Sequence, residues 1–376
     1  MGLLREAFGL SRAEVADAVG RNPDWLRTVE AGRQRIDRQA MLVALADALG
    51  VSTGELLGVP CGREDPVAGA THRALPALRR AVLRTALPPG PAAQRGSAGG
   101  LRGRLSAVTG LRREARWTDL ALTLPALLDD LRAAESPEVT DLLAAALHES
   151  ALLAKRLGAH DLAALAAAEA RRSATAGGDP ALVASTVWLQ AEVALSAGAT
   201  DEAAALLEAG LAAAGGLLGR QDRHAWAVWG TLHLVSAVLE GQRGRQAESS
   251  GHLAEAAAAL AHTDASTAGA TGFGEGEWAV HTVHAALELG EDLGALERID
   301  GMDLGDLPAE RRARHGIDRA RVLARVGDAA GAARELLAAD RVGAQVVRTH
   351  PLVAELLRTA PAAAVADAAA TLGVPL

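Results

Sequence analysis

Four titratable residues have the spacing of a single helical face. Glu277, His281, His284 and Glu288 are separated by four, three and four residues, so a helix would place their side chains on one side. Imidazoles and carboxylates in this arrangement could bind zinc or contact a polar effector. Because ligands from one helix seldom complete a tetrahedral shell, we predict hydrogen-bonded, partly buried histidines and no metal site. Effector contact by Glu277, His281 and His284 is the alternative.

Tryptophans and histidines supply a second set of candidate effector contacts. Trp188, Trp226 and Trp229, with His224 and His233, could combine an apolar surface with polar groups on the concave side of a helical body. Packing in a core is the competing interpretation of each tryptophan. No nucleophile, general base and orienting acid occur together, so the sequence predicts neither an enzyme nor a cofactor.

The elements that must position these residues are predicted to be helices throughout. Alanine and leucine dominate, tyrosine is absent and phenylalanine occurs twice, which leaves little material for strands. We therefore expect an all-α protein. No charged-then-apolar leader and no apolar stretch of membrane-spanning length is found, so a cytoplasmic protein is expected. The single cysteine, Cys61, excludes an internal disulfide.

The first sixty residues carry the start signals of three short helices. Residues 11–14 and 52–55 have the pattern of capping boxes, and Asn22-Pro23-Asp24 combines an N-cap residue with a proline and an acid in the first turn. A helix-turn-helix needs a small residue where its helices cross, a glycine at the turn and apolar residues behind them. These positions are filled by Ala16, Gly20, Leu26 and Val29.

Three segments of this region resemble the lambda-repressor/Cro-like helix-turn-helix domain of XRE-type regulators: Leu10–Ala16, Trp25–Arg33 and Arg38–Val51. The resemblance covers about the first 58 residues and implies that the second helix of the motif enters the major groove of DNA. It assigns base contacts to Asn22, Asp24, Arg27 and Thr28, and phosphate contacts to Arg12, Arg33, Arg35 and Arg38.

The sequence departs from the family pattern at three positions. Arg12 stands where the family usually has glutamine, Arg21 replaces an apolar residue, and Pro23 occupies a position where a polar recognition residue is common. An alternative interpretation is therefore a protein-interaction scaffold whose helix-turn-helix no longer reads DNA, with its arginines solvated or paired with Glu30 and Asp37. The intact core spacing favours a DNA-binding domain.

Charge divides the chain into three parts that agree with the expected domains. Residues 1–60, the DNA-binding domain, carry a net charge of −1; residues 61–116, an Arg-rich linker with helices, carry +8; residues 117–376 carry −15. An acidic body of this size would be repelled by phosphates, so contact with double-stranded DNA must come from the first third. The basic segment could steady the DNA backbone or pair with the acidic body.

Residues 117–376 are predicted to form a solenoid of helical hairpins that senses an effector and mediates dimerisation. Breaks recur roughly every 40 residues, and several are followed by an Asp and an alanine-rich amphipathic helix. One hairpin per period resembles the tetratricopeptide repeats. The expected helix ends are Gly158, Gly198, Gly241, Gly290 and Gly327.

The C-terminal part also resembles a group of actinobacterial regulators that join this DNA-binding domain to such repeats. The matching segments are Phe273–Gly274, Leu287–Gly290, Leu307–His315 and Val347–Val353. The departure lies in Glu275–Trp278, directly after Phe273–Gly274. Phe273 is a further candidate effector contact. The resemblance implies a transcriptional regulator that acts as a homodimer on two half-sites about 34 Å apart or a multiple of that distance, with a peptide, a small molecule or a protein as effector.

Overall fold

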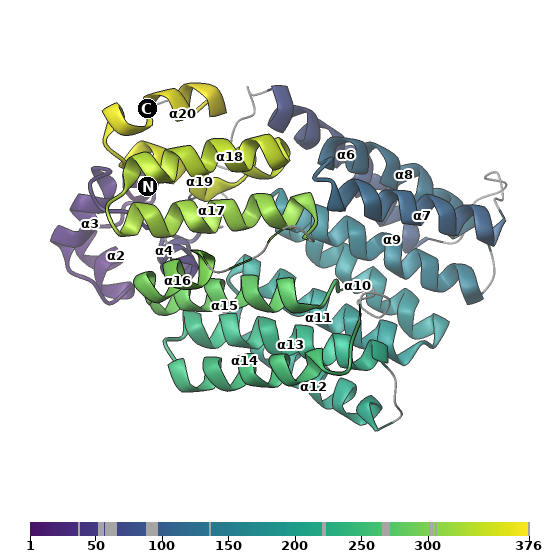
Figure 1. Ribbon diagram of the computed structural model, residues 1–376. Coiled ribbons are helices and arrows are strands. Elements are labelled where there is room, and N and C mark those ends of the chain that lie inside the picture. Colours follow the sequence, from purple (N-terminus) through teal and green to yellow (C-terminus); the bar gives the residue numbers. More distant parts are fainter. Residues whose placement is uncertain are drawn as a thin grey trace.

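The computed structural model describes residues 1–36, 38–51, 56, 66–87, 97–134, 137–219, 223–264, 271–300, 302, 304 and 307–374. Helices are the only regular elements within these ranges, which confirms the all-α prediction (Figure 1). No helix in the described part of the chain is both long and apolar enough to cross a membrane. The predicted capping box at 52–55, Asp37 and Cys61 lie outside the described residues.

The described part of the N-terminal domain contains four short helices, of which the second and third begin at the predicted start signals. They are α1 (Gly2–Ala7), α2 (Arg12–Ala18), α3 (Pro23–Glu30) and α4 (Gln39–Leu49). The Ser11 hydroxyl accepts a hydrogen bond from the Glu14 amide at 3.2 Å, and the Glu14 carboxylate accepts one from the Ser11 amide at 2.7 Å. This reciprocal pair satisfies two amides that a helix start leaves unbonded.

The core of the N-terminal domain contains the residues that the helix-turn-helix pattern predicts. Gly20 has a φ of +64°, the left-handed conformation required between α2 and α3. Behind this turn lies a single apolar cluster. Its fully buried members include Val15, Ala16, Leu26, Leu45 and Ala46.

The remainder of the described chain forms a helical body. Consecutive helices pack as antiparallel hairpins, and the most extensive contacts join α9 to α10, α11 to α12, α13 to α14 and α17 to α18. The bounds are α6 (Pro66–Thr85), α7 (Ala98–Arg113), α8 (Trp117–Ala133), α9 (Pro137–Arg156), α10 (His160–Gly177), α11 (Pro180–Ala197), α12 (Thr200–Leu218), α13 (Arg223–Gln242), α14 (Gln246–Leu260), α15 (Glu275–Leu289), α16 (Asp292–Asp300), α17 (Ala309–Arg325), α18 (Ala329–Arg348), α19 (Pro351–Thr359) and α20 (Ala362–Leu372).

Most of the predicted hairpin breaks lie at left-handed glycines. Gly158, Gly198, Gly290 and Gly327 have φ values between +72° and +94° and lie one or two residues after a helix end. The prediction for Gly241 is wrong, because that residue lies within α13 and the left-handed turn is made by Gly244. A side chain at Gly241 would lie 3.1 Å from the Ala285 carbonyl oxygen, so this glycine permits close packing of α13 on α15.

Helices α6 and α7, which lie between the two predicted domains, belong to the body. Buried residues of α6 and α7, such as Leu78 and Val108, lie in the same apolar core as α8 and α9. The arginines of this segment pair with the acidic body, which was one of the two expected roles. The pairs are Arg79–Asp161 (2.5 Å), Arg84–Asp129 (2.7 Å), Arg102–Glu138 (2.6 Å) and Arg104–Asp130 (2.5 Å).

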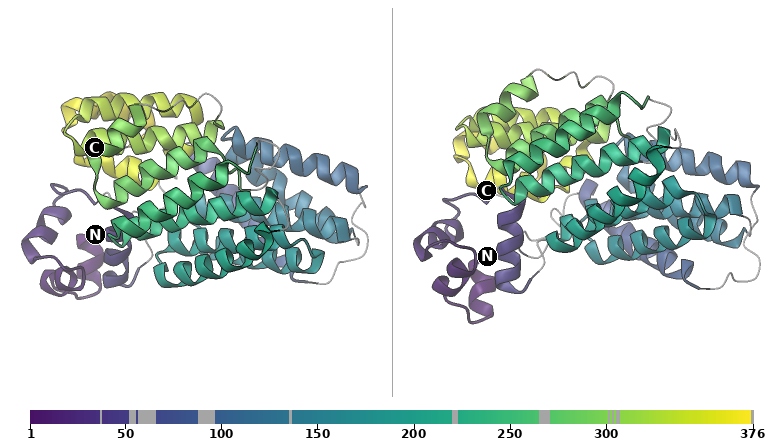
Figure 2. Two further views of the ribbon diagram at one scale, coloured as in Figure 1. Left: turned by 60° about the horizontal axis from the view of Figure 1, so that its bottom comes forward. Right: turned by 90° about the horizontal axis from the view of Figure 1, so that it is seen from below.

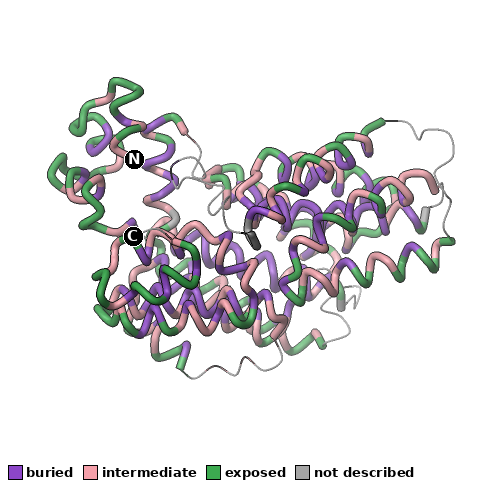
Figure 3. The backbone as a smooth tube through the Cα atoms, turned by 90° about the horizontal axis from the view of Figure 1, so that it is seen from above, coloured by how far each residue is buried: buried purple, intermediate pink, exposed green. Residues whose placement is uncertain are grey.

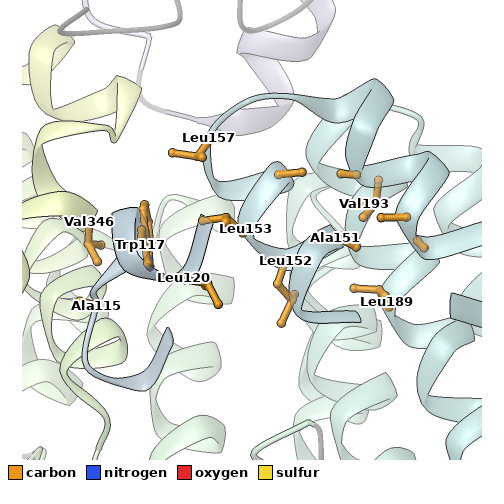
Figure 4. Packing of buried hydrophobic residues seen from close by; sticks show 14 of the residues in the cluster. Ala115, Trp117, Leu120, Ala151, Leu152, Leu153, Leu157, Leu189, Val193 and Val346 are labelled. Atoms are coloured by element: carbon orange, nitrogen blue, oxygen red, sulfur yellow. The ribbon is translucent and has the colours of Figure 1, made fainter. Parts of the chain in front are cut away.

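The body curves until its last helices meet its first (Figure 1). Val346 on α18 lies beside Trp117 and Ala115 at the start of α8 (Figure 4). The Gln345 side-chain oxygen accepts a hydrogen bond from the Thr118 amide at 2.8 Å. A side chain at Gly343 would lie 3.1 Å from the Cβ of Ala115, so a glycine permits the approach. These contacts join segments about 230 residues apart and close the body on itself.

The N-terminal domain is placed at one end of the body, next to the C-terminal helices (Figure 2). Many of its residues are exposed, whereas the helices of the body bury the sides that face one another (Figure 3). Leu352 on α19 packs against the core of the N-terminal domain. A side chain at Gly198, after α11, would lie 2.7 Å from Val43 on α4. We call this contact region between α4 and the ends of α11, α15 and α19 the domain seam.

Candidate nucleic-acid interface and central cavity

Helix α3 has one packed face and one free face. Leu26 and Val29 are buried in the core of the N-terminal domain, while Asp24 and Arg27 point to solvent with 84% and 57% of their side chains exposed. Arg27 Nη2 lies 3.2 Å from Asp24 Oδ1. An exposed pair of this kind is weak, so both groups are available to a partner.

The other two predicted base contacts have local roles as well. The Asn22 side-chain oxygen accepts a hydrogen bond from the Trp25 amide at 2.7 Å, as an N-cap residue does. The Thr28 hydroxyl donates to the Trp25 carbonyl at 2.7 Å. These bonds leave the Asn22 amide group free to donate outward and fix the rotamer of Thr28.

The four arginines predicted to contact phosphates differ in exposure and in their neighbours. Arg33 is exposed after α3. Arg12 Nε lies 2.6 Å from Glu30, although 46% of the Arg12 side chain is exposed. Arg35 lines a small hollow against α17 and α19, and a side chain at Gly290 would collide with the Arg38 guanidinium. Arg35 and Arg38 therefore lie at the domain seam.

Sequence reasoning missed Arg5, which is central to this domain. Arg5 Nε donates to Glu30 at 2.5 Å, and Arg5 Nη1 donates to the Leu10 carbonyl at 2.9 Å. Burial opposes ionisation of Glu30, but its bonds to Arg5 and Arg12 lower the pKa of the carboxyl below its ordinary value. The carboxylate thereby ties α1 and α2 to the end of α3.

Comparison with known proteins supports the geometry of this domain. A family model described as a helix-turn-helix domain matches residues 1–57. Within the described part of this range, the chain forms a helix-turn-helix domain. The family match covers this domain alone. No curated protein matches the chain.

A cavity of about 200 Å³ lies beneath the helix-turn-helix domain. Its wall is built from the ends of α9, α11 and α13, from α15, α17 and the start of α19, and from Leu42 of α4. The helix-turn-helix domain thus contributes a side chain to a cavity that otherwise belongs to the body.

The wall of this cavity is rich in ionisable groups, and cations exceed carboxylates. Four cations and two carboxylates line it. Three of the cations are paired, and one carboxylate pairs outside the wall. The pairs are Lys155–Glu192, Arg156–Glu310 (3.2 Å), Arg311–Glu277 (2.7 Å) and Asp318–Arg321 (2.8 Å).

Arg314 is the cation of the wall that has no partner among the described residues. No ion pair or hydrogen bond joins its guanidinium to another described group. Burial, together with repulsion from Arg156 and Arg311, lowers the pKa of Arg314 to about 9. The guanidinium thus lies in the wall without a hydrogen-bonded partner, although the more distant carboxylates of Asp318 and Glu310 raise its pKa in part.

The predicted helical face of α15 forms part of the cavity. His281 and His284 line it, whereas Glu277 and Glu288 do not and pair with Arg311 and Arg321. His281 Nδ1 donates to the Glu277 carbonyl at 2.9 Å, and burial, together with repulsion from Arg311, lowers the pKa of His281 to about 4. His281 is therefore neutral at pH 7. Within the described ranges, no three His, Cys, Asp or Glu side chains are grouped so as to hold a metal ion.

The predicted aromatic contacts lie away from the cavity wall. Trp188 is buried and stacks on His148 at 5.3 Å between ring centres. The others lie on or near α13, in or beside a separate apolar cluster whose buried members include Phe273. Their contacts are Trp226–His262 (4.0 Å), Trp229–His233 (4.6 Å) and Phe273 beneath Gly230, and His224 is exposed. The structure thus brings together His281 and His284, but not the tryptophans.

Sequence reasoning missed most of the charged residues of the wall. Arg311, Arg314 and Asp318 are spaced by three and four residues, which predicts one face of a helix. The same spacing was recognised in α15 but not in α17. Lys155, the only lysine in the chain, lies on α9. It is far from α17 in the sequence, so the sequence alone did not indicate that the two are close in space.

Proposed function

We propose that this protein is a sequence-specific transcriptional regulator that binds double-stranded DNA through α3. The observation that carries the proposal is the free face of α3, where Asp24 and Arg27 are exposed opposite the packed Leu26 and Val29. Arg27 is suited to guanine and Asp24 to the amino group of cytosine. Asn22, Thr28 and the exposed Arg33 extend this surface.

The proposal includes a homodimer in the cytoplasm and a body that binds an effector without catalysing a reaction. One helix-turn-helix domain contacts too few base pairs for a specific site, so two copies on two half-sites are required. The central cavity is the site that we assign to the effector. Its support is the position of Leu42, which brings the DNA-binding domain into direct contact with the cavity.

The domain seam offers a way for effector binding to change DNA binding. Arg35 and Arg38, two phosphate contacts of the proposal, lie against the body at this seam. A ligand that contacts Leu42 changes the free energy of docking only if it binds the docked and released arrangements unequally. Release of α4 would free both arginines for phosphates.

The test is a fluorescence-anisotropy titration of the full chain against fragments of its own genome. We expect selective, salt-sensitive binding that Arg27→Ala weakens by roughly tenfold or more. Arg341→Ala is the matched control, because Arg341 is exposed on α18 of the body. If binding is weak and changes neither with the DNA sequence nor with Arg27→Ala, the proposal is wrong. The protein would then be an interaction scaffold whose helix-turn-helix does not read DNA.

A further inference from the structure

We propose that the central cavity binds a small organic monocarboxylate, whose carboxylate pairs with Arg314 and whose apolar part lies against the leucines and valines of the wall. The regulatory consequence of this binding rests on the proposed function, but the binding itself does not. The site requires a ligand with one negative charge and an apolar body of limited size.

The charge of the ligand follows from the pairing inside the wall. Lys155, Arg156 and Arg311 already have carboxylate partners, whereas Arg314 has none among the described residues. A guanidinium binds a carboxylate through two parallel hydrogen bonds. One unpaired cation calls for one anion, and the nearby carboxylates of Glu192 and Asp318 oppose a second negative charge.

The apolar part of the ligand follows from the rest of the lining. Leu42 and Leu352 come from the domain seam, and the body adds Leu157, Leu195 and Val280. A cluster of paired charges beside an apolar wall fits an amphipathic molecule better than inorganic phosphate or a sugar acid, which have no apolar surface to bury.

The size of the ligand follows from the volume. An apolar cavity of about 150 Å³ is known to hold benzene, so about 200 Å³ accommodates a molecule such as benzoate or hexanoate. An effector peptide of several residues would exceed this volume. Of the effector classes considered from the sequence, the cavity favours a small molecule.

The binding test uses isothermal titration of the full chain with benzoate, phenylacetate and hexanoate, and with benzamide as the uncharged counterpart of benzoate. We expect saturable binding of at least one acid, with benzamide weaker than benzoate by tenfold or more. Arg314→Gln should weaken binding of the acid by tenfold or more. Arg312→Gln, an exposed neighbour on the same helix, should leave the affinity within twofold.

Three results would overturn the assignment. These are no saturable binding by any of the acids at 10 mM, equal binding of benzamide, or full affinity in a folded Arg314→Gln variant. A crystal of the wild-type protein soaked in the acid that binds needs no variant: the carboxylate must lie within hydrogen-bonding distance of Arg314, and density elsewhere also refutes the site. Binding of an acid by a protein that does not bind DNA would retain the cavity assignment and refute the proposed function.

Discussion

Two neighbouring groups of buried charges differ in whether their arginines have carboxylate partners. In the first, the carboxylates of Glu149 and Glu310 alternate with Arg112 and Arg156, and each guanidinium has at least one partner within 3.2 Å. In the second, Arg314 faces the central cavity without a partner among the described residues. The first group joins α7, α9 and α17 and is complete in itself, whereas the second is complete only with a ligand.

This contrast separates a structural charge from one that is available for binding. Although burial opposes its ionisation, Arg156 and Arg112 lower the pKa of Glu310 to about 2, so the protein itself stabilises the ionised form. Arg314 has no such ion pair: burial and its cationic neighbours lower its pKa, and the more distant carboxylates of Asp318 and Glu310 offset this only in part. Removal of charge should therefore have opposite effects on the two groups.

The largest effect is expected for Glu310→Gln. The Glu310 side chain is 2% exposed and is shared by Arg112 and Arg156. Its loss removes the partner of Arg156 and leaves Arg112 with Glu149 alone. We expect the free energy of unfolding in urea to fall by about 3–5 kcal/mol. The control is Glu138→Gln, whose pair with Arg102 is exposed; it should change stability by less than about 1 kcal/mol. Equal losses in both variants would contradict the distinction.

The same carboxylate should make stability depend on pH. Its pKa is about 2 in the folded protein against an ordinary value of 4.5. The stabilisation is fully present above about pH 4.5 and is lost as the pH falls towards 2. In urea titrations between pH 7 and pH 3, the difference between the wild type and Glu310→Gln should therefore narrow below about pH 4.5. A difference that stays constant down to pH 3 would show that the pKa is not lowered.

Substitutions of two arginines in the cavity wall should change stability by smaller amounts, and in opposite directions. Arg156→Met removes a partner of Glu310 and should lower the free energy of unfolding by about 2–3 kcal/mol. Arg314→Met removes a charge that has no ion-pair partner among the described residues and keeps an apolar stem, so it should raise stability by about 1 kcal/mol in the absence of a ligand. Thermal unfolding in buffers without carboxylates measures both. Destabilisation by Arg314→Met would assign Arg314 a structural role.

The smallest effect is expected on the free face of α3. Arg27 and Asp24 form an exposed pair, so Arg27→Ala should change the free energy of unfolding by no more than about 0.5 kcal/mol. Urea unfolding of the variants used for the DNA titration measures this. A larger loss would mean that reduced DNA binding reports on folding rather than on contact with bases.

Local features of the fold were predictable because their causes are local. The capping box at Ser11 and Glu14, the turn at Gly20 and the cap at Asn22 each depend on a few adjacent residues. Hairpin breaks at left-handed glycines belong to the same class. The error at Gly241 arose because a glycine within a helix, placed there for close packing, cannot be distinguished from a helix end by composition.

The cavity was predictable only in part, because it depends on contacts between distant segments. The helical face that contains His281 and His284 was recognised from its spacing, but its neighbours Lys155 and Arg314 are about 160 residues apart. Their proximity results from the angles accumulated over several hairpins, and no local pattern encodes those angles. The tryptophans were nominated by residue type alone, and the structure places them in separate packed regions.

The contact of Val346 and Gln345 with the start of α8 constrains how this architecture can change during evolution. An open repeat array gains or loses a hairpin without disturbing the others, since each unit contacts only its neighbours. Here an added or deleted hairpin would separate the two ends and expose the apolar surfaces around Trp117. Relatives that retain this closure should therefore vary in loop length and side chains while keeping the same number of hairpins.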